Sequence, residues 1–146
     1  MPSINFFLED INFRVRKKKL IRNWLLLTIK KEGGELDNIN LIFTSDNYLH
    51  HINVEHLNHD TLTDIITFEY NETGEPITSD IFISVDRVKE NSVTFRQRQL
   101  DELHRIIVHG TLHLLGYKDK NKSDKELMTI KEDYYLSLRS EDLLNY

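Results

Sequence analysis

The longest helix that the sequence predicts constrains the fold more than any other segment. It runs from Leu100 to Leu115, "LDELHRIIVHGTLHLL", and the next residue is Gly116. Glycine is the residue that most often follows a helix C-terminus, because it adopts the left-handed backbone conformation without steric cost. We therefore expect a helix in the protein core that ends at a sharp turn after Leu115.

The segments around this helix alternate between strand and helix patterns. The order of these patterns is strand, helix, strand, helix, strand, strand and three helices, which predicts an α+β fold with a mixed four-stranded sheet and about five helices. The strands are expected at 4–7, 38–45, 65–70 and 80–85, and the helices at 20–34, 46–57, 85–92, 100–115 and from 123 onward. In the last helix, Ser123 and Glu126 resemble a capping box, and the predicted apolar stripe is Leu127, Ile130, Tyr134 and Leu138.

Length and composition point to one soluble domain. The chain has 146 residues, which favours a single domain over 1–146, and it has no cysteine, which excludes disulfides and thiolate metal ligands. The N-terminal segment "MPSINFFLEDINF" has neither a basic start nor a long apolar run, so we expect no signal peptide. No apolar stretch is long enough for a membrane span, and we expect a cytoplasmic protein.

Basic residues are concentrated in two places, although the formal net charge is −5. The segment "RVRKKKLIR" (14–22) holds six of them, and "FRQRQ" adds Arg96 and Arg98. A solvated surface is the ordinary explanation of such runs. The first run precedes a predicted helix, however, and cations oppose the dipole at a helix N-terminus, so phosphate binding is the alternative interpretation.

The segment "HGTLHLLGYKD" (109–119) has the spacing of a metal site. His109 and His113 are four residues apart on the predicted helix, so their imidazoles leave the same face one turn apart. Gly116 lets the chain turn, and Asp119 is placed to fold back toward them. Two imidazole nitrogens, one carboxylate and an open position suit a catalytic zinc ion. The alternative is that both histidines belong to the core and Asp119 is a surface acid.

The same spacing occurs in the zinc-protease pattern H-E-x-x-H-x-x-G-x-x-H, with two differences. Gly110 replaces the glutamate, and Asp119 replaces the third histidine. Because that glutamate is the general base of the protease, its loss argues against peptide hydrolysis. A glycine inside a helix also costs about 1 kcal/mol relative to alanine, so we expect another element to pack closely against Gly110.

The motif resembles the H-G-x-L-H-L-x-G-Y-D-H signature of the YbeY family of metal-dependent endoribonucleases and ribosomal RNA maturation factors. Two further segments, "LTDIITF" (62–68) and "SDIFIS" (79–84), are similar to that family's P-T-D-V-L-S-F and G-D-I-x-I-S motifs. The order of the motifs and the chain length agree as well.

This resemblance implies hydrolytic cleavage of single-stranded RNA in 3′-end maturation of the small-subunit ribosomal RNA, with a role in ribosome quality control. It implies one divalent ion per chain, for which we expect Zn²⁺, and the small ribosomal subunit as partner. His109 and His113 match the first two metal ligands, and Asp119 takes the place of the third histidine. We expect these three residues to be both the metal ligands and the catalytic residues.

Other positions depart from the family pattern or have two interpretations. Lys118 stands where the family usually has aspartate, and Leu57 stands where it usually has an arginine that would hold phosphate. Arg96 or Arg98 is then a candidate for facing the RNA. If no cation substitutes, the alternative function is a ribosome-assembly factor with a structural metal and little catalysis.

Four polar residues outside the triad have competing interpretations. Asp64 and Asp80, within the two upstream motifs, are candidates for orienting a metal ligand, and turn or cap carboxylates are the alternative. Glu102 is interpreted as an acid that suits the helix N-terminus, with a base facing the site as the alternative. His104 is expected to be exposed to solvent.

Overall fold

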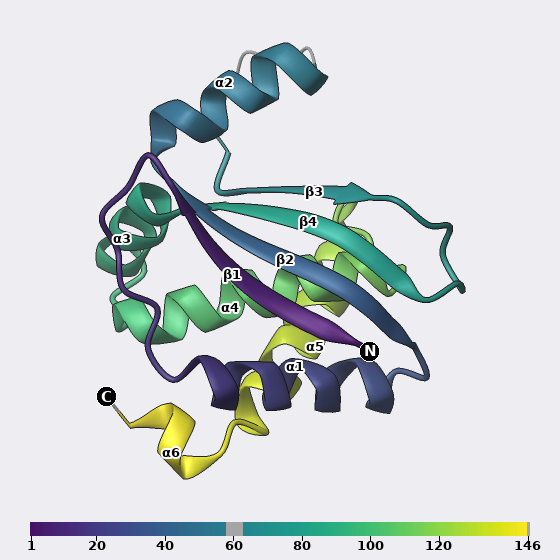
Figure 1. Ribbon diagram of the computed structural model, residues 1–146. Helices are drawn as coiled ribbons and strands as arrows, with labels where there is room; N and C mark the ends of the chain where they lie inside the picture. The colour runs from purple at the N-terminus through teal and green to yellow at the C-terminus, as the bar shows by residue number, and fades with distance from the viewer. Residues whose placement is uncertain (58–62, 146) are drawn as a thin grey trace.

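The computed structural model describes residues 1–57 and 63–145 and contains four strands and six helices in that range (Figure 1). In chain order these are β1 (Ser3–Glu9), α1 (Lys18–Lys31), β2 (Leu36–Thr44), α2 (Asp46–Leu57), β3 (Ile65–Glu69), β4 (Ile77–Ser84), α3 (Val85–Thr94), α4 (Gln99–Leu114), α5 (Lys122–Ser137) and α6 (Glu141–Leu144). The predicted order is confirmed, and the short α6 is added at its end.

The sheet is mixed and has the strand order β1-β2-β4-β3. β1 pairs in parallel with β2, β2 pairs in parallel with β4, and β3 is antiparallel to β4. Side chains alternate between the two faces, so Leu41 on β2 and Ile81 on β4, which are paired neighbours, are both fully buried on the same face. The α+β prediction with a four-stranded mixed sheet is confirmed.

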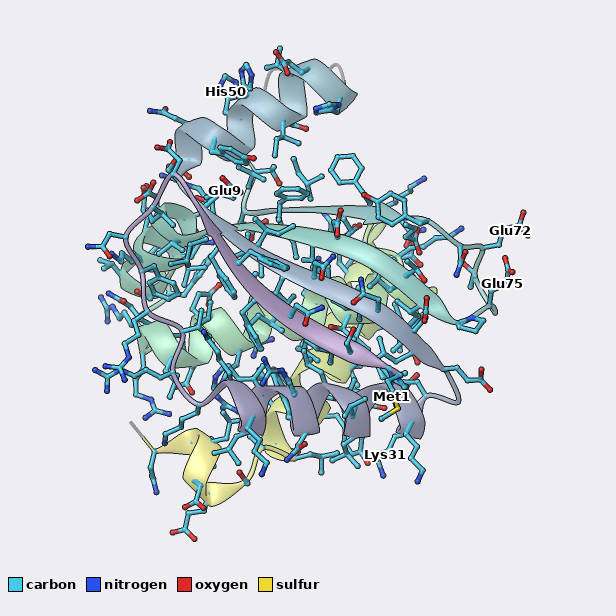
Figure 2. All side chains as sticks on the ribbon, viewed as in Figure 1. Met1, Glu9, Lys31, His50, Glu72 and Glu75 are labelled. Atoms are coloured by element: carbon cyan, nitrogen blue, oxygen red, sulfur yellow. The ribbon has the colours of Figure 1, made fainter. Side chains whose placement is uncertain are left out.

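The two faces of the sheet are covered differently. α1, α4 and α5 lie on one side, where most of the buried apolar side chains form one core, and α2 lies on the other side (Figure 1). Under α2, a small second cluster joins Leu49 and Ile52 to Ile66 of β3. Figure 2 shows the β3–β4 connection, marked by Glu72 and Glu75, at the end of β3 away from α2. No helix among the described residues is long and apolar enough to cross a membrane.

α4 lies directly against the sheet at Gly110. A Cβ atom at this position would lie 2.7 Å from Cδ1 of Ile65 on β3 and 3.3 Å from Cγ2 of Ile81 on β4. Both distances are shorter than ordinary van der Waals contact, so only glycine fits without a shift. The expected close packing against Gly110 is therefore confirmed, and β3 and β4 are the elements that approach it.

α4 ends as the sequence predicts, in a two-bond C-terminal turn. The N–H of Tyr117 donates to the carbonyl of Leu112 at 3.1 Å, and the N–H of Gly116 donates to that of His113 at 3.0 Å. Gly116 has φ 104°, the left-handed region that this turn requires. The turn brings Tyr117 and the residues after it back beside the last turn of the helix.

α5 buries a different face from the predicted one. Leu127, Ile130 and Tyr134 are 45%, 63% and 43% exposed, whereas Met128 and Glu132 are buried. The helix begins after Asn121, whose side chain accepts from the N–H of Asp124 at 2.8 Å, so the capping box at Ser123 and Glu126 was wrong. Leu138, the fourth residue of the predicted stripe, does pack against the core. The other three positions were wrong because the buried face carries polar groups that bond to α1 and α4, and apolar periodicity does not detect them.

His104 was also predicted wrongly, because it is fully buried. Its ring lies 5.5 Å from that of Trp24 on α1, and its Nδ1 lies 2.9 Å from a guanidinium nitrogen of Arg139. Burial, followed by the charge of Arg139, lowers the pKa of His104 to about 3. This histidine is therefore a neutral part of the core between α1 and α4.

Candidate metal centre

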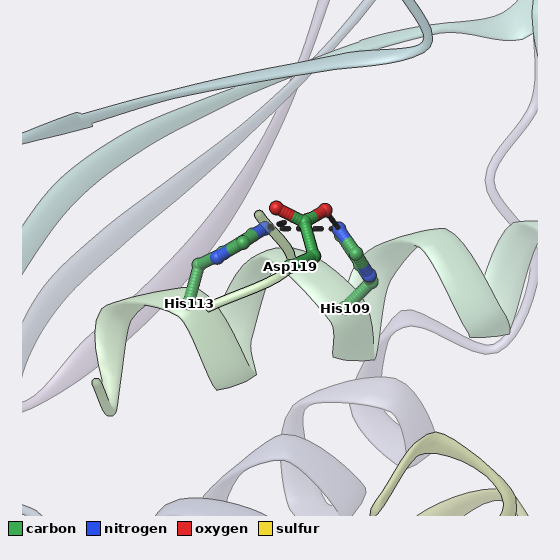
Figure 3. A group of neighbouring side chains, drawn as sticks. All are labelled: His109, His113 and Asp119. Atoms are coloured by element: carbon green, nitrogen blue, oxygen red, sulfur yellow. Dashed lines mark hydrogen bonds and ion pairs between the residues drawn. The ribbon is translucent and has the colours of Figure 1, made fainter. Parts of the chain in front are cut away.

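Three ligand atoms converge where α4 ends (Figure 3). The Nε2 atoms of His109 and His113 are 3.0 Å apart, and Oδ2 of Asp119 lies 3.4 Å from the first and 3.5 Å from the second. The two histidines are on α4, and Asp119 is on the connection to α5. The structure thus brings together the three residues that the sequence predicts as metal ligands.

The spacing of these atoms fits one divalent ion. Ligand atoms about 2.0–2.1 Å from zinc at tetrahedral angles lie about 3.3 Å from one another, close to the three separations observed. Two imidazole nitrogens and a carboxylate oxygen are also the donor types that zinc accepts. All three side chains are partly exposed, so a fourth position is accessible from solvent.

The backbone turn after α4 orients His113. Its Nδ1 donates to the carbonyl of Tyr117 at 2.9 Å, which leaves the lone pair of Nε2 directed at Asp119 and His109. The hydroxyl of Tyr117 donates to Glu32 at the end of α1 at 2.5 Å. The glycine turn and this contact with α1 therefore fix both the second histidine and the segment that carries the third ligand.

A buried carboxylate orients His109. Its Nδ1 lies 2.5 Å from Oε2 of Glu132 on α5, and the other oxygen of Glu132 accepts from Arg105 at 2.7 Å. A carboxylate behind a ligating histidine fixes the tautomer and makes the other ring nitrogen a better donor. Sequence analysis missed Glu132 because it is 23 residues from His109, and no local spacing links the two. The one available signal was an acid within the apolar spacing of Met128 and Tyr135.

The site is rich in carboxylates, and this shifts the pKa of several groups. Burial alone would lower the pKa of His109, but the hydrogen bond and charge of Glu132, together with Asp119 and Asp64, raise it above its ordinary value. Burial raises the pKa of the carboxyls of Asp64 and Glu102, and it outweighs the nearby cations that oppose the shift. A divalent cation would reverse these shifts, because it is attracted to the same negative charges.

The structure separates the two aspartates that the sequence predicts as orienting residues. Asp64 precedes β3 on the side of α4, where its charge acts on His109. Asp80 lies on the opposite face of β4 from its neighbour Ile81, and its oxygens accept from Asn40 at 2.9 Å and from the Tyr70 hydroxyl at 2.7 Å. Asp64 therefore lies near the candidate metal ligands, whereas Asp80 belongs to a polar network on the other face of the sheet.

Arg96 and Arg98 lie at the other end of α4 from the metal ligands. Arg98 precedes α4 and forms an ion pair with Asp101 at 2.8 Å, and Arg96 lies in the turn before it with φ 55°. His109 follows Arg98 by eleven positions along α4, and eleven steps of 1.5 Å correspond to about 16 Å. The structure does not bring either arginine to the site. Leu57 is the last residue of α2, and the residues directly after it, 58–62, are outside the described part.

Comparison with known proteins gives the same family for almost the whole chain. The family model described as Endoribonuclease YbeY matches residues 4–139. The Endoribonuclease YbeY of Cytophaga hutchinsonii is 49% identical over 94% of this chain and 96% of its own length, and that of Flavobacterium johnsoniae is 47% identical over 92% and 96%. The solution structure of TM1509 from Thermotoga maritima superposes with a TM-score of 0.66 at 25% identity, over 99% of this chain and 97% of that one. The chain therefore belongs to the YbeY endoribonuclease family.

Proposed function

We propose that this protein is a metal-dependent endoribonuclease that cleaves single-stranded RNA during 3′-end maturation of the small-subunit ribosomal RNA. The observation that carries the proposal is the convergence of His109 Nε2, His113 Nε2 and Asp119 Oδ2 within 3.5 Å of one another in a chain of this family. The small ribosomal subunit would be the partner and the cytoplasm the location, and ribosome quality control would depend on the same activity.

In this proposal, each side chain of the site has a separate role. His109, His113 and Asp119 hold a divalent ion, for which Zn²⁺ is our first candidate because two imidazoles and one carboxylate suit it. When bound, a divalent ion would supply Lewis-acid polarisation of a phosphate group and would make a water molecule more acidic. Glu132 keeps the proton of His109 on Nδ1, and the Tyr117 carbonyl does the same for His113.

Asp64 is our candidate for moving a proton at the site. Gly110 occupies the position where a zinc protease has its glutamate base, so another carboxyl has to accept the proton. Asp64 lies close enough to the ligand set for its charge to act on His109, and it is not itself one of the three candidate ligands. A carboxyl within reach of the reacting group can accept and return a proton.

The first experiment measures bound metal and RNA cleavage together. Protein purified without chelators or a histidine tag is analysed for metal content and is then assayed on single-stranded RNA that covers the precursor 3′ end. We expect one ion per chain and cleavage in the wild type, and the loss of both in His113→Ala and Asp119→Ala. The matched control is His51→Ala, because His51 is an exposed histidine on α2, paired with Glu55 at 3.1 Å.

Two results would contradict the proposal. Cleavage that persists in metal-free His113→Ala would show that another site, or a contaminant, cuts the RNA. Association with the small subunit that survives in all variants, without turnover on any RNA, would instead indicate an assembly factor with a structural metal.

A further inference from the structure

The connection that carries the metal ligand Asp119 is unusually rich in lysine. Residues 117–126 read "YKDKNKSDKE", with lysines at 118, 120, 122 and 125. The first two flank Asp119 directly, and the last two fall in the first turn of α5. We call these four residues the lysine rim.

The ammonium groups of the lysine rim are available for a ligand. All four residues are exposed, and no ion pair in the described part of the chain involves any of them. Two other cations near the site are already bound within the protein: Arg105 pairs with Glu132 and Asp133, and Lys131 pairs with Glu32 at 3.3 Å. The rim therefore supplies the free positive charge beside the metal ligands, in a chain whose net charge is −5.

The position of these lysines is costly for the fold. Lys122 and Lys125 lie at the N-terminus of α5, where the helix dipole disfavours cations. A phosphate group bound there would offset this cost, because its negative charge would interact favourably with both the ammonium groups and the helix dipole.

The rim borders an open cleft of about 740 Å³. Lys120, Lys122 and Lys125 line one part of it, and Thr129 and Ile130 of α5 line another. Lys120, which lines the cleft, directly follows the candidate metal ligand Asp119 in the chain. Residues 117–126 contain four lysines. Apart from the candidate metal ligand Asp119, the acidic residues of this segment are Asp124 and Glu126.

The other basic segment, 14–22, is less suited to act at this centre. It follows β1, which is the opposite edge of the sheet from β3, the strand beside the metal site. Some of its charges are also engaged: Lys17 donates to the carbonyls of Asp142 and Asn145, and Lys18 and Arg22 lie over the ring of Phe6.

We propose that the lysine rim binds the phosphate backbone of single-stranded RNA next to the scissile phosphodiester. This inference rests on the proposed endoribonuclease function and adds the residues that hold its substrate. The contacts would be with phosphate groups alone, so they would position RNA of any sequence and would weaken with salt.

The test compares two triple variants with the same change in net charge. Lys118→Gln/Lys120→Gln/Lys122→Gln removes charge from the rim, and the matched control, Lys19→Gln/Lys30→Gln/Lys89→Gln, removes it from exposed lysines elsewhere. Metal content is measured first and is expected to equal that of the wild type in both. Affinity for a single-stranded RNA, made uncleavable by 2′-O-methylation, is then measured over a range of salt concentrations, followed by KM and kcat on cleavable RNA.

We expect the rim variant to bind RNA about tenfold more weakly at low salt, with KM raised and kcat nearly retained. Each lost phosphate contact should make the slope of log affinity against log salt shallower by about 0.7. The control variant should keep both the affinity and the slope.

If both variants bound RNA equally weakly, or if the rim variant bound it as tightly as the wild type, the inference would be overturned. Metal-dependent cleavage by the wild type would still support the proposed function in that case. Absence of cleavage in the wild type, with RNA affinity lost only in the rim variant, would overturn the function and leave the rim as an RNA site. Loss of binding to polyglutamate with unchanged RNA affinity would assign the rim to an acidic protein.

Discussion

At the scale of single residues, the two histidines of the candidate metal site form hydrogen bonds to different acceptors. His109 donates to the charged carboxylate of Glu132, whereas His113 donates to the neutral carbonyl of Tyr117. A charged acceptor increases the electron donation of the opposite ring nitrogen more than a neutral one does. Glu132 should therefore contribute to metal affinity directly, in addition to orienting the ring.

We expect Glu132→Gln to weaken metal binding by about ten- to a hundredfold, because the amide keeps the hydrogen bond but loses the charge. Competition with a metal-chelating dye measures the affinity. Glu126→Gln, an exposed change on the same helix, is the control and should leave the affinity unchanged. Equal affinities in wild type and Glu132→Gln would mean that Glu132 only supports the fold.

His104 gives a prediction about acid stability. It is buried against Trp24, its Nδ1 accepts from Arg139, and its Nε2 has no hydrogen-bond partner among the described residues. Other charges act on it as well, and the groups concerned are Asp101, Arg98 and Lys17. Its pKa is about 3 in the folded protein and has an ordinary value of 6.5.

Because only the unfolded chain takes up this proton, the contribution of His104 to stability is complete above pH 6.5 and is lost as the pH falls toward 3. Between pH 6 and 4 the metal-free wild type should lose about 1.4 kcal/mol more per pH unit than His104→Gln. Urea unfolding at several pH values, with a chelator present, measures both slopes. Parallel slopes would contradict the assignment of a neutral buried histidine.

At the scale of elements, the turn that ends α4 positions two of the three candidate ligands, His113 and Asp119. Because the chain turns at Gly116, the carbonyl of Tyr117 accepts a hydrogen bond from His113. The same turn brings Asp119 back beside the two histidines. A side chain at φ 104° is strained whatever space surrounds it. Function and local backbone conformation therefore depend on the same residue.

We expect Gly116→Ala to cost about 1 kcal/mol of stability and, in addition, to raise the metal dissociation constant, because the turn no longer holds its geometry. Gly74→Ala is the control: Gly74 has φ 96° in the β3–β4 connection, and a Cβ atom added there would meet no atom within 4 Å. Thermal unfolding and metal titration measure the two effects. If both variants lose stability and both keep wild-type metal affinity, the turn does not position the ligands.

At the scale of the whole molecule, the metal centre joins distant elements. Its ligands lie on α4 and the α4–α5 connection, Glu132 comes from α5, and Glu32 at the end of α1 accepts from Tyr117. These contacts form only in the folded protein. An ion bound there should therefore stabilise the fold as a unit.

We expect free metal at a hundred times its dissociation constant to raise the free energy of unfolding by about 2.7 kcal/mol, and EDTA to remove this gain. Differential scanning calorimetry with and without EDTA tests this in the wild type and in Asp119→Ala. The variant should unfold at the same temperature in both conditions. A wild type that is insensitive to EDTA after metal loading would contradict a site formed on folding.

The local features of this protein could be predicted from its sequence. The helix ending at Gly116, the strand order along the chain and the spacing of His109, His113 and Asp119 all depend on residues close to one another. Helical geometry places positions four apart on one face, and a left-handed glycine ends a helix, whatever the rest of the fold does. For this reason the spacing of the motif was enough to indicate three residues that lie together and could hold a metal ion.

Contacts between elements decided the rest. Glu132 behind His109, the burial of His104 against Trp24 and the exposure of Leu127, Ile130 and Tyr134 all depend on how α1, α4 and α5 pack together. A buried polar side chain is stable only with a partner, and the partners of His109 and His104 lie 23 and 35 residues away in the chain. The sequence by itself determined which residues can bind the metal, and only the tertiary structure decided which residues hold them in place.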